Sequence, residues 1–281
     1  MAAHKGNSMN IVIGIDKGFI QHGMVMLVSL FMNNKDSHIN LYVLHTDFFP
    51  GLNYIQELEN KFDANIYMVT VKAADLGNVK VDGHISIATY YRLLIGELLP
   101  QTCEKVMYLD CDMVIAGSLL PFWQTSIDGD NIVAAIPELE SETKHLLGIK
   151  PDEEYFNAGV LLIDLKKWRN ANMGKQLTQY LDGNRDRIKY WDQDVLNAVL
   201  INKWKMLGKE WNYITRYTYP EKIDPVIIHY AGQNKPWTVG YEDPFGHQYF
   251  KYLKATPYYR KYLVGKFERK VGSLINKLTG K

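Results

Sequence analysis

A short apolar run that ends in two acids constrains the fold more than any other part of the sequence. Residues 106–109 are apolar and are followed directly by Asp110, Cys111 and Asp112. Such a run predicts a strand with both faces covered, as in a parallel sheet. Because side chains alternate along an extended chain, Asp110 and Asp112 should leave it on the same side.

Two carboxylates this close repel each other and resist burial, and a divalent cation removes both costs. Carboxylates with open coordination positions suit Mg²⁺ or Mn²⁺ that also holds a diphosphate. The acid pair alone is also typical of a solvated turn after a strand, so its meaning depends on the rest of the chain.

The segments before the acid pair alternate between strand and helix. Short β-branched runs predict strands over residues 10–16, 39–45 and 65–71, and apolar residues at helical spacing predict helices over 25–32 and 52–62. This order requires right-handed crossovers and a parallel sheet, the nucleotide-binding half of a doubly wound α/β fold. Ligands of such sheets bind beyond the carboxyl ends of the strands, which places Asp16, Lys17 and the acid pair at one rim.

The later segments continue the α/β pattern. A helix from Ile87 places Ala88 and Arg92 one turn apart, and the small residues 157–159 predict a turn that another group can approach closely. Asp192 and Asp194 open a helix, where they are equally typical of capping acids. The other expected segments are a strand over 132–136, a flexible flap over 138–154, an apolar strand over 160–165 and a strand over 226–232 that contains His229.

Composition narrows the class of protein. The chain has 281 residues, of which 47% are hydrophobic and 22% charged, as in an ordinary globular protein. A net charge of +1 gives no electrostatic case for binding nucleic acid. Cys103 and Cys111 are expected to be free buried thiols, which favours a reducing, cytoplasmic location. No membrane span or signal peptide is predicted, and residues 1–8 are interpreted as a leader or cloning remnant.

The C-terminal segment Lys261–Lys281 carries six basic residues and one acid, with apolar residues at helical spacing. A basic amphipathic helix can lie on an anionic membrane surface, here the inner face, which would give the protein a peripheral membrane contact. A helix packed on its own domain, or a frayed tail, explains the pattern as well. The expected division is a single catalytic domain over 9–255 and a basic tail over 256–281.

Four motifs, in this order, resemble glycosyltransferase family 8. They are Tyr-Leu-Asp-X-Asp at 108–112, Phe-Asn-Ala-Gly-Val-Leu-Leu-Ile-Asp-Leu at 156–165, Asp-Gln-Asp-X-Leu-Asn at 192–197 and His-Tyr-X-Gly-X-X-Lys-Pro-Trp at 229–237. The similarity covers roughly residues 9–253, and bacterial lipopolysaccharide or lipooligosaccharide galactosyltransferases are the most similar members. The resemblance implies a GT-A-type fold, with a Rossmann-like, mostly parallel sheet flanked by helices and a small C-terminal helical tail.

The family resemblance also implies an activity. Its members are retaining, metal-dependent transferases that move galactose or glucose from a UDP-sugar donor to an acceptor hydroxyl, here expected on a glycan or lipid-linked glycan. Asp110, Asp112 and His229 would ligate Mn²⁺, and two carboxylates with one imidazole suit Mn²⁺ better than Mg²⁺, which stays possible.

Further site residues follow from the resemblance alone. Gln193, Asp192 and Lys235 would be catalytic, with Gln193 near the anomeric carbon and Lys235 and His84 neutralising the leaving UDP. The donor-binding residues would be Gly14, Ile15 and Asp16 at the uracil, His84 and Lys235 at the diphosphate, Arg92, Asn157, Asp192 and Gln193 at the sugar, and also Thr89, Asp110, Cys111, Ala158 and Gly232.

Two positions depart from the family pattern. Gly18 stands where close relatives place an asparagine for the uracil, and Pro137-Glu138 stands where they place an aspartate that helps to hold the sugar. The alternatives are a metal-dependent nucleotidyltransferase or phosphodiesterase, which shares the acid pair, and a non-catalytic UDP-sugar-binding module.

Overall fold

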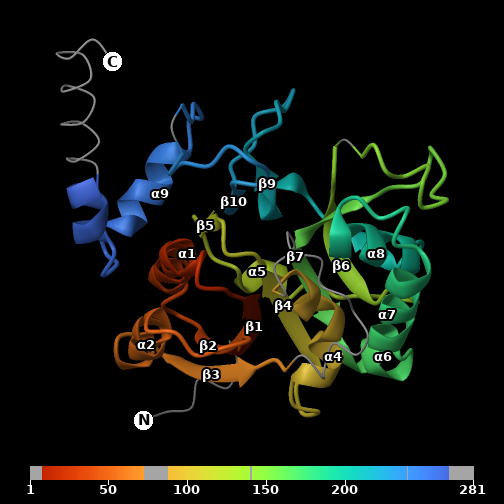
Figure 1. Cartoon of the computed structure of the whole chain (residues 1–281), viewed down its shortest axis with the longest axis horizontal. Helices are drawn as coiled ribbons and strands as arrows, with labels where there is room; N and C mark the ends of the chain where they lie inside the picture. Colours follow the sequence, from red (N-terminus) through yellow and green to blue (C-terminus); the bar gives the residue numbers. More distant parts are fainter. Residues whose placement is uncertain (1–7, 73–87, 140, 239, 266–281) are drawn as a thin grey trace.

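The computed structural model describes residues 8–72, 88–139, 141–238 and 240–265 (Figure 1). Its larger sheet has seven strands in the order β3-β2-β1-β4-β7-β6-β8. The strands are β1 (Ser8–Gly14), β2 (His38–His45), β3 (Ala64–Thr70), β4 (Lys105–Leu109), β6 (Val133–Pro137), β7 (Phe156–Asp164) and β8 (Trp204–Met206). β1 begins one residue inside the segment 1–8, and Ser8 pairs with His38.

The first four strands of this sheet form the parallel half that the sequence predicts. β1 pairs in parallel with both β2 and β4, and β2 pairs in parallel with β3. The connecting helices are α1 (Ile20–Asn33) and α2 (Gly51–Gln56), with a 3₁₀ turn at Glu57–Asn60. The strand–helix–strand prediction is confirmed, although the helix predicted over 52–62 changes to 3₁₀ geometry at Glu57.

The position of residues 157–159 corrects the sequence prediction. Asn157, Ala158 and Gly159 do not form a turn but lie within β7, which runs antiparallel to both β4 and β6. The physical reason is pairing on both sides: the backbone N–H of Asp110 donates to the carbonyl of Gly159 at 2.9 Å. The first residues of β7 therefore lie at the carboxyl ends of the parallel strands.

Alternating side chains of the sheet divide the core into two layers. Ile11, Ile13 and Met107 point toward α1 and α2, whereas Val12 and Tyr108 point toward the helices on the other face. Those helices are α3 (Ala88–Tyr91), α4 (Ile95–Leu98), α6 (Leu165–Asn170), α7 (Met173–Gly183) and α8 (Trp191–Val199), with a 3₁₀ turn at Arg92–Leu94. Both faces are covered, as the apolar run of β4 predicts.

A second, three-stranded sheet continues from the acid pair. Its strands are β5 (Met113–Ile115), β10 (Ile227–His229) and β9 (Tyr213–Ile214), in the order β5-β10-β9. β10 is antiparallel to β5, with His229 opposite Met113, and the backbone N–H of Tyr230 donates to the carbonyl of Asp112 at 2.9 Å. This pairing places the end of β10 beside the end of β4. The remaining elements are α5 (Leu120–Trp123), a 3₁₀ turn at Lys209–Trp211 and α9 (Gly246–Leu253).

Some predictions concern residues that the structure does not describe. His84 lies outside the described residues, as does most of the predicted C-terminal helix, of which only residues 261–265 are included. Among the described residues, none of the helices has both the length and the apolar character needed to cross a bilayer. The domain division and the membrane contact stay predictions.

Candidate active site

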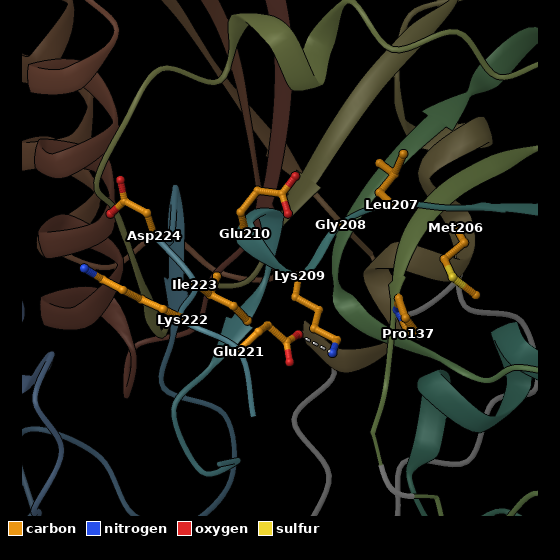
Figure 2. Close-up of a pocket in the computed structure, with 10 residues that line it drawn as sticks. All are labelled: Pro137, Met206, Leu207, Gly208, Lys209, Glu210, Glu221, Lys222, Ile223 and Asp224. Carbon is orange, nitrogen blue, oxygen red and sulfur yellow. Dashed lines mark hydrogen bonds and ion pairs between the residues drawn. The ribbon is translucent and has the colours of Figure 1, made fainter. Parts of the chain in front are cut away.

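A cavity of about 500 Å³ opens beside β8 and the loop that follows β9, where Lys209 Nζ and Glu221 Oε1 form an ion pair at 2.7 Å (Figure 2). Its lining residues are Pro137, Met206, Leu207, Gly208, Lys209, Glu210, Glu221, Lys222, Ile223 and Asp224. None of the predicted metal or donor residues that the structure describes lines this cavity. The candidate site lies instead at the carboxyl ends of β1 and β4.

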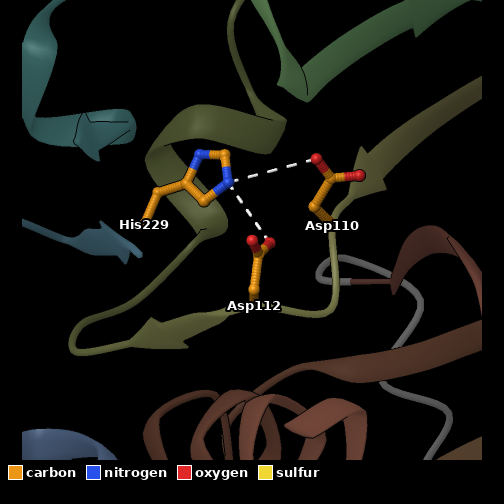
Figure 3. Close-up of side chains that lie close together, drawn as sticks. All are labelled: Asp110, Asp112 and His229. Atoms are coloured by element: carbon orange, nitrogen blue, oxygen red, sulfur yellow. Dashed lines mark ion pairs between the residues drawn. The ribbon is translucent and has the colours of Figure 1, made fainter. Parts of the chain in front are cut away.

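Asp110, Asp112 and His229 converge at that edge (Figure 3). One ligand atom from each residue can be chosen so that all three lie within 4.8 Å of one another. His229 Nε2 lies 3.3 Å from Asp112 Oδ1 and 4.0 Å from Asp110 Oδ2. The chain bends at Cys111 and Asp112 instead of staying extended, but the two carboxylates still face the same imidazole.

Each carboxylate divides its two oxygens between a protein partner and the space in front of His229. Asp110 Oδ1 accepts from Tyr108 Oη and from Arg92 Nη2, both at 2.8 Å, and Asp112 Oδ2 accepts from Lys235 Nζ. The other two oxygens face the imidazole. Two carboxylate oxygens and one imidazole nitrogen are a donor set that suits Mn²⁺.

The backbone beside this cluster leaves room for no side chain. A Cβ atom on Gly159 would lie 2.4 Å from His229 Cε1 and 2.9 Å from Asp110 Oδ2. The glycine of the Asn-Ala-Gly sequence therefore allows β7 to pass directly behind the cluster. The donor set and this close approach fit a bound divalent cation held by Asp110, Asp112 and His229.

The charges around Asp112 keep it ionised. Burial by itself would raise the pKa of Asp112, but His229 and Lys235 beside it outweigh that effect and lower the pKa below its usual value. A carboxylate that is already deprotonated is the form that binds a cation.

Arg92 links the acid pair to the start of α8. It is 9% exposed, and its guanidinium lies over the ring of Tyr108 at 4.4 Å and donates to the carbonyl of Ala158 at 2.6 Å. Its Nε also lies 2.5 Å from Asp192 Oδ2, an ion pair without an aligned hydrogen bond. One buried cation is thus shared between Asp110 and Asp192. Burial by itself would lower the pKa of Arg92, but the two carboxylates outweigh that effect and raise the pKa above its usual value.

Asp192 has an unusual pKa for an aspartate. Burial raises the pKa from 3.8 to about 7, with Arg92 opposing the shift and Asp110 adding to it. Folded protein therefore holds more protons on Asp192 than unfolded protein does between these two pH values. Folding stability should fall as pH rises through this window, because the charged form is disfavoured in the folded state.

Asp192→Asn is expected to remove this pH dependence. The free energy of unfolding of the wild type, relative to that of the variant, should fall by up to about 4 kcal/mol between about pH 4 and pH 7, at 1.4 kcal/mol per pKa unit. Urea unfolding at four pH values measures the difference. Asp130→Asn, at an exposed position in the turn before β6, is the control. Parallel stability curves for wild type and Asp192→Asn would show that Asp192 stays charged throughout.

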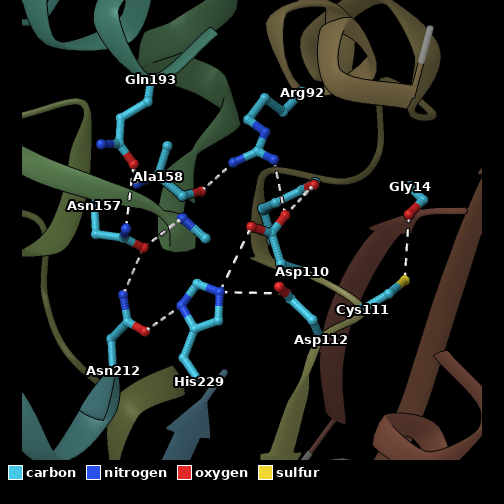
Figure 4. Close-up of polar contacts among 12 residues, drawn as sticks. Gly14, Arg92, Asp110, Cys111, Asp112, Asn157, Ala158, Gln193, Asn212 and His229 are labelled. Atoms are coloured by element: carbon cyan, nitrogen blue, oxygen red, sulfur yellow. Dashed lines mark hydrogen bonds and ion pairs between the residues drawn. The ribbon is translucent and has the colours of Figure 1, made fainter. Parts of the chain in front are cut away.

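A set of amide side chains continues from α8 to His229 (Figure 4). Gln193 Oε1 accepts from the backbone N–H of Ala158 at 3.0 Å and from Asn157 Nδ2 at 3.2 Å. Asn157 Nδ2 also donates to Glu138 Oε2 at 2.8 Å, and Asn212 Nδ2 donates to Asn157 Oδ1 at 2.9 Å. The amide of Gln193 is therefore held against β7, beside the Arg92–Asp192 pair.

Asp194 has a structural role in this arrangement. Its carboxylate is fully buried and accepts from the hydroxyls of Thr143 and Tyr155, each at 2.7 Å, and from the backbone N–H groups of Lys189 and Tyr190, each at 2.8 Å. These bonds join the predicted flap to the start of α8. Of the two acids that open the helix, Asp194 satisfies backbone donors as a capping acid does, whereas Asp192 faces Arg92.

The predicted uracil-binding residues lie at the end of β1. Gly14 ends the strand, Ile15 continues the pairing toward β2, and Asp16 Oδ1 accepts from the backbone N–H groups of Gly18 and Phe19 at 2.7 and 3.0 Å. Cys111 connects this segment to the acid pair, since its buried Sγ donates to the carbonyl of Gly14 at 3.3 Å. Burial raises the pKa of the Cys111 thiol, which keeps it protonated.

The loop after β10 supplies Lys235 and a stacked aromatic group. The rings of His22 and Trp237 stack with centroids 3.6 Å apart, and His22 Nδ1 lies 2.7 Å from the hydroxyl of Tyr249. Burial lowers the pKa of His22 to about 4, so this imidazole is neutral near pH 7. Two further predicted residues complete the set. Gly232 lies in the same loop and has a φ of +92°, and Thr89 lies in α3.

Sequence reasoning did not identify all the residues at this site. Asn212, which is 1% exposed and contacts both His229 and Asn157, was not predicted, because nothing in the sequence distinguishes it from other polar residues between predicted elements. Arg216, from the loop after β9, lies 3.3 Å from Glu138 Oε1 and was not predicted either. Only the departure at Glu138 signalled that this part of the site differs from the family pattern.

Comparison with known proteins places this site in a family. Residues 10–239 match Glycosyl transferase family 8. General stress protein A of Bacillus subtilis is 27% identical over 272 residues, 90% of this chain and 95% of that protein. Lipopolysaccharide 1,3-galactosyltransferase of Salmonella typhimurium is 28% identical over 248 residues, 82% of this chain and 73% of that protein.

A solved structure shows the same fold. The galactosyltransferase LgtC, in complex with donor and acceptor sugar analogues, aligns with a TM-score of 0.78 and 28% identity over 89% of this chain and 96% of LgtC. A second LgtC structure carries an active-site replacement of glutamine by glutamate. The GT-A-type fold implied by the four motifs is confirmed. The chain belongs to glycosyltransferase family 8 and is a glycosyltransferase.

Proposed function

We propose that this glycosyltransferase moves a galactosyl or glucosyl group from a UDP-sugar to an acceptor hydroxyl, with retention of anomeric configuration and with Mn²⁺. The observation that carries the proposal is the convergence of Asp110, Asp112 and His229 beside the Arg92–Asp192 pair. A cation site and a buried polar group next to it match the two halves of such a donor, its diphosphate and its sugar. A nucleotidyltransferase or phosphodiesterase would not need the buried polar group that is proposed to bind the sugar. The family match also argues against both of these classes.

The residues around the cation site suit the departure of UDP. A bound Mn²⁺ would act as a Lewis acid that stabilises negative charge on the diphosphate. Lys235, paired with Asp112, places a second positive charge at the same position. Asp16 and the backbone of Gly14 and Ile15 would bind the uracil, although Gly18 offers no side chain to it.

The sugar-binding residues favour attack on the same face that UDP leaves. Gln193 is a neutral amide held by β7, and a neutral amide is a poor nucleophile. Asp192 is bound to Arg92, and Asp194 is enclosed by four donors. None of these side chains is presented as a free carboxylate nucleophile. We infer that the departing phosphate oxygen takes the proton from the acceptor hydroxyl.

The relatives support a glycan or lipopolysaccharide-type acceptor, since several are named as lipopolysaccharide galactosyl- or glucosyltransferases. The loop after β9, which contains Arg216 and Tyr217, and the predicted flap over 138–154 would contact this acceptor. Basic residues in Lys261–Lys281 would bring the enzyme to a membrane that carries a lipid-linked acceptor.

A panel of UDP-sugars tests the donor. Purified protein is incubated with UDP-galactose, UDP-glucose, UDP-N-acetylglucosamine and UDP-xylose, with Mn²⁺ or with a chelator, and UDP release is measured. We expect release from UDP-galactose or UDP-glucose only in the presence of metal. Binding of UDP without release from any donor, in the presence of an acceptor mixture, would favour a non-catalytic binding module.

Gln193→Ala is expected to lower turnover much more than donor affinity, because the amide would act on the anomeric centre and not on UDP. A loss of about 10²-fold in turnover is the expected size for a lost electrostatic contact in an active site. The measurement is kcat for transfer beside the Kd for UDP-sugar. Gln176→Ala, at an exposed position of α7, is the matched control. Equal rates of donor hydrolysis in wild type and Gln193→Ala would place this residue away from the reacting atoms.

A further inference from the structure

A buried asparagine holds the imidazole of His229 from the side that does not face the acids. Oδ1 of Asn212 lies 2.9 Å from Nδ1 of His229, while Nε2 of the same ring faces Asp110 and Asp112 (Figure 4). Asn212 lies between the 3₁₀ turn Lys209–Trp211 and β9. It belongs to none of the four motifs that carry the family resemblance.

The orientation of each amide in this group is fixed by partners that can act in only one way. The backbone N–H of Gly159 can only donate, and it lies 3.0 Å from Oδ1 of Asn157. The carboxylate of Glu138 pairs with Arg216 through Oε1, and its Oε2 accepts from Nδ2 of Asn157 at 2.8 Å. If the Asn157 amide were turned over, its nitrogen would face the N–H of Gly159, donor against donor. Its oxygen would face the carboxylate of Glu138, acceptor against acceptor.

The orientation of Asn157 then determines that of Asn212. Because Asn157 presents its oxygen, the Asn212 atom at 2.9 Å from it must be the amide nitrogen. Asn212 consequently presents Oδ1 to His229, so Nδ1 of the ring carries a proton. A neutral imidazole with its proton on Nδ1 has its lone pair on Nε2, the atom that faces both acids.

We propose that Asn212 is a positioning residue for the metal site: it fixes the tautomer and the ring orientation of His229 so that Nε2 is presented to the cation. The inference rests on the proposed metal-dependent function and adds the residue that orients one ligand. Hydrogen-bond partners of this kind set the direction and the basicity of a histidine ligand. The same bonds run from Glu138 through Asn157 to His229, and so join the sugar-binding residues to the cation site.

Metal affinity gives the first test. Asn212→Ala is expected to weaken Mn²⁺ binding by roughly 10–100-fold, measured by calorimetric titration of the metal-free protein. Asn212→Asp keeps an acceptor toward Nδ1 and should retain more of the affinity than Asn212→Ala. Asn34→Ala is the matched control, since Asn34 is also a buried amide, which donates to the carbonyls of Leu30 and Gly117 and accepts from the N–H of Leu119. It should lose stability but bind Mn²⁺ as the wild type does.

The position of the ring proton gives the second test. Nitrogen NMR of histidine-labelled, metal-free protein is recorded under conditions in which the His229 signals are those of a neutral imidazole. It should find the proton on Nδ1 in wild type and Asn212→Asp. In Asn212→Ala the proton should move to Nε2, which lies 3.3 Å from the carboxylate oxygen Oδ1 of Asp112. A wild-type proton on Nε2, or unchanged Mn²⁺ affinity in Asn212→Ala, would overturn the inference. A wild type with the proton on Nδ1 that binds no Mn²⁺ would refute the metal-dependent function and leave the role of Asn212 in orienting the ring established.

Discussion

Replacing Asp110 by asparagine is expected to lower Mn²⁺-dependent UDP release by about 10³-fold or more. Stabilisation of charge by a catalytic metal contributes several kcal/mol, and each 1.4 kcal/mol corresponds to about tenfold in rate. Asparagine is chosen over alanine because its Oδ1 atom can still accept from Tyr108 and Arg92, as the carboxylate does at 2.8 Å. The substitution therefore removes the charge that faces His229 and keeps the hydrogen bonds behind it.

The measurement is UDP release from the donor chosen by the panel, with a metal titration beside it. A chelator should reduce the wild type to the rate of the variant, and added Mn²⁺ should restore only the wild type. Asp130→Asn, the exposed substitution used above, should match the wild type. Wild-type-like release by Asp110→Asn in Mn²⁺ would show that the acid pair does not hold the cation.

Replacing Arg92 by methionine is expected to lower the free energy of unfolding by about 3–5 kcal/mol. Arg92 is the buried cation shared by Asp110 and Asp192, and removing one member of a buried ion pair leaves uncompensated charge behind. Methionine has a similar length, so little of the loss comes from an empty cavity. Arg92→Lys keeps a positive charge but cannot reach both acids and the carbonyl of Ala158 in the same way, and should give an intermediate loss.

Chemical denaturation measures this effect. Arg185→Met is the control, because Arg185, in the turn after α7, pairs with Asp182 at 2.8 Å at the protein surface, where such pairs contribute at most about 1 kcal/mol. If the free energy of unfolding of Arg92→Met lay within about 1 kcal/mol of the wild-type value, the guanidinium would not be the main group that compensates the charge of the two buried acids.

The sequence by itself determined the parallel half of the sheet and the position of its acid pair. The β-branched runs of β1, β2 and β3 and the apolar run of β4 predict strands because alternation and burial act over a few residues. The four motifs and their order also identified the resemblance to glycosyltransferase family 8. The helix that begins before Asp192 was expected for the same local reason, since its apolar residues repeat at helical spacing.

Only the tertiary structure decided how the distant segments meet. The antiparallel direction of β7 places Asn157 inside a strand at the carboxyl edge, and the pairing of β10 with β5 places His229 opposite the acids. The contacts of Arg92 with Asp192, and of Asn212 with His229, follow from these pairings. The alternation of side chains within one strand determines which face is buried. It does not specify the direction of the strand or which distant segment pairs with it, because those depend on contacts between segments that are far apart in the chain.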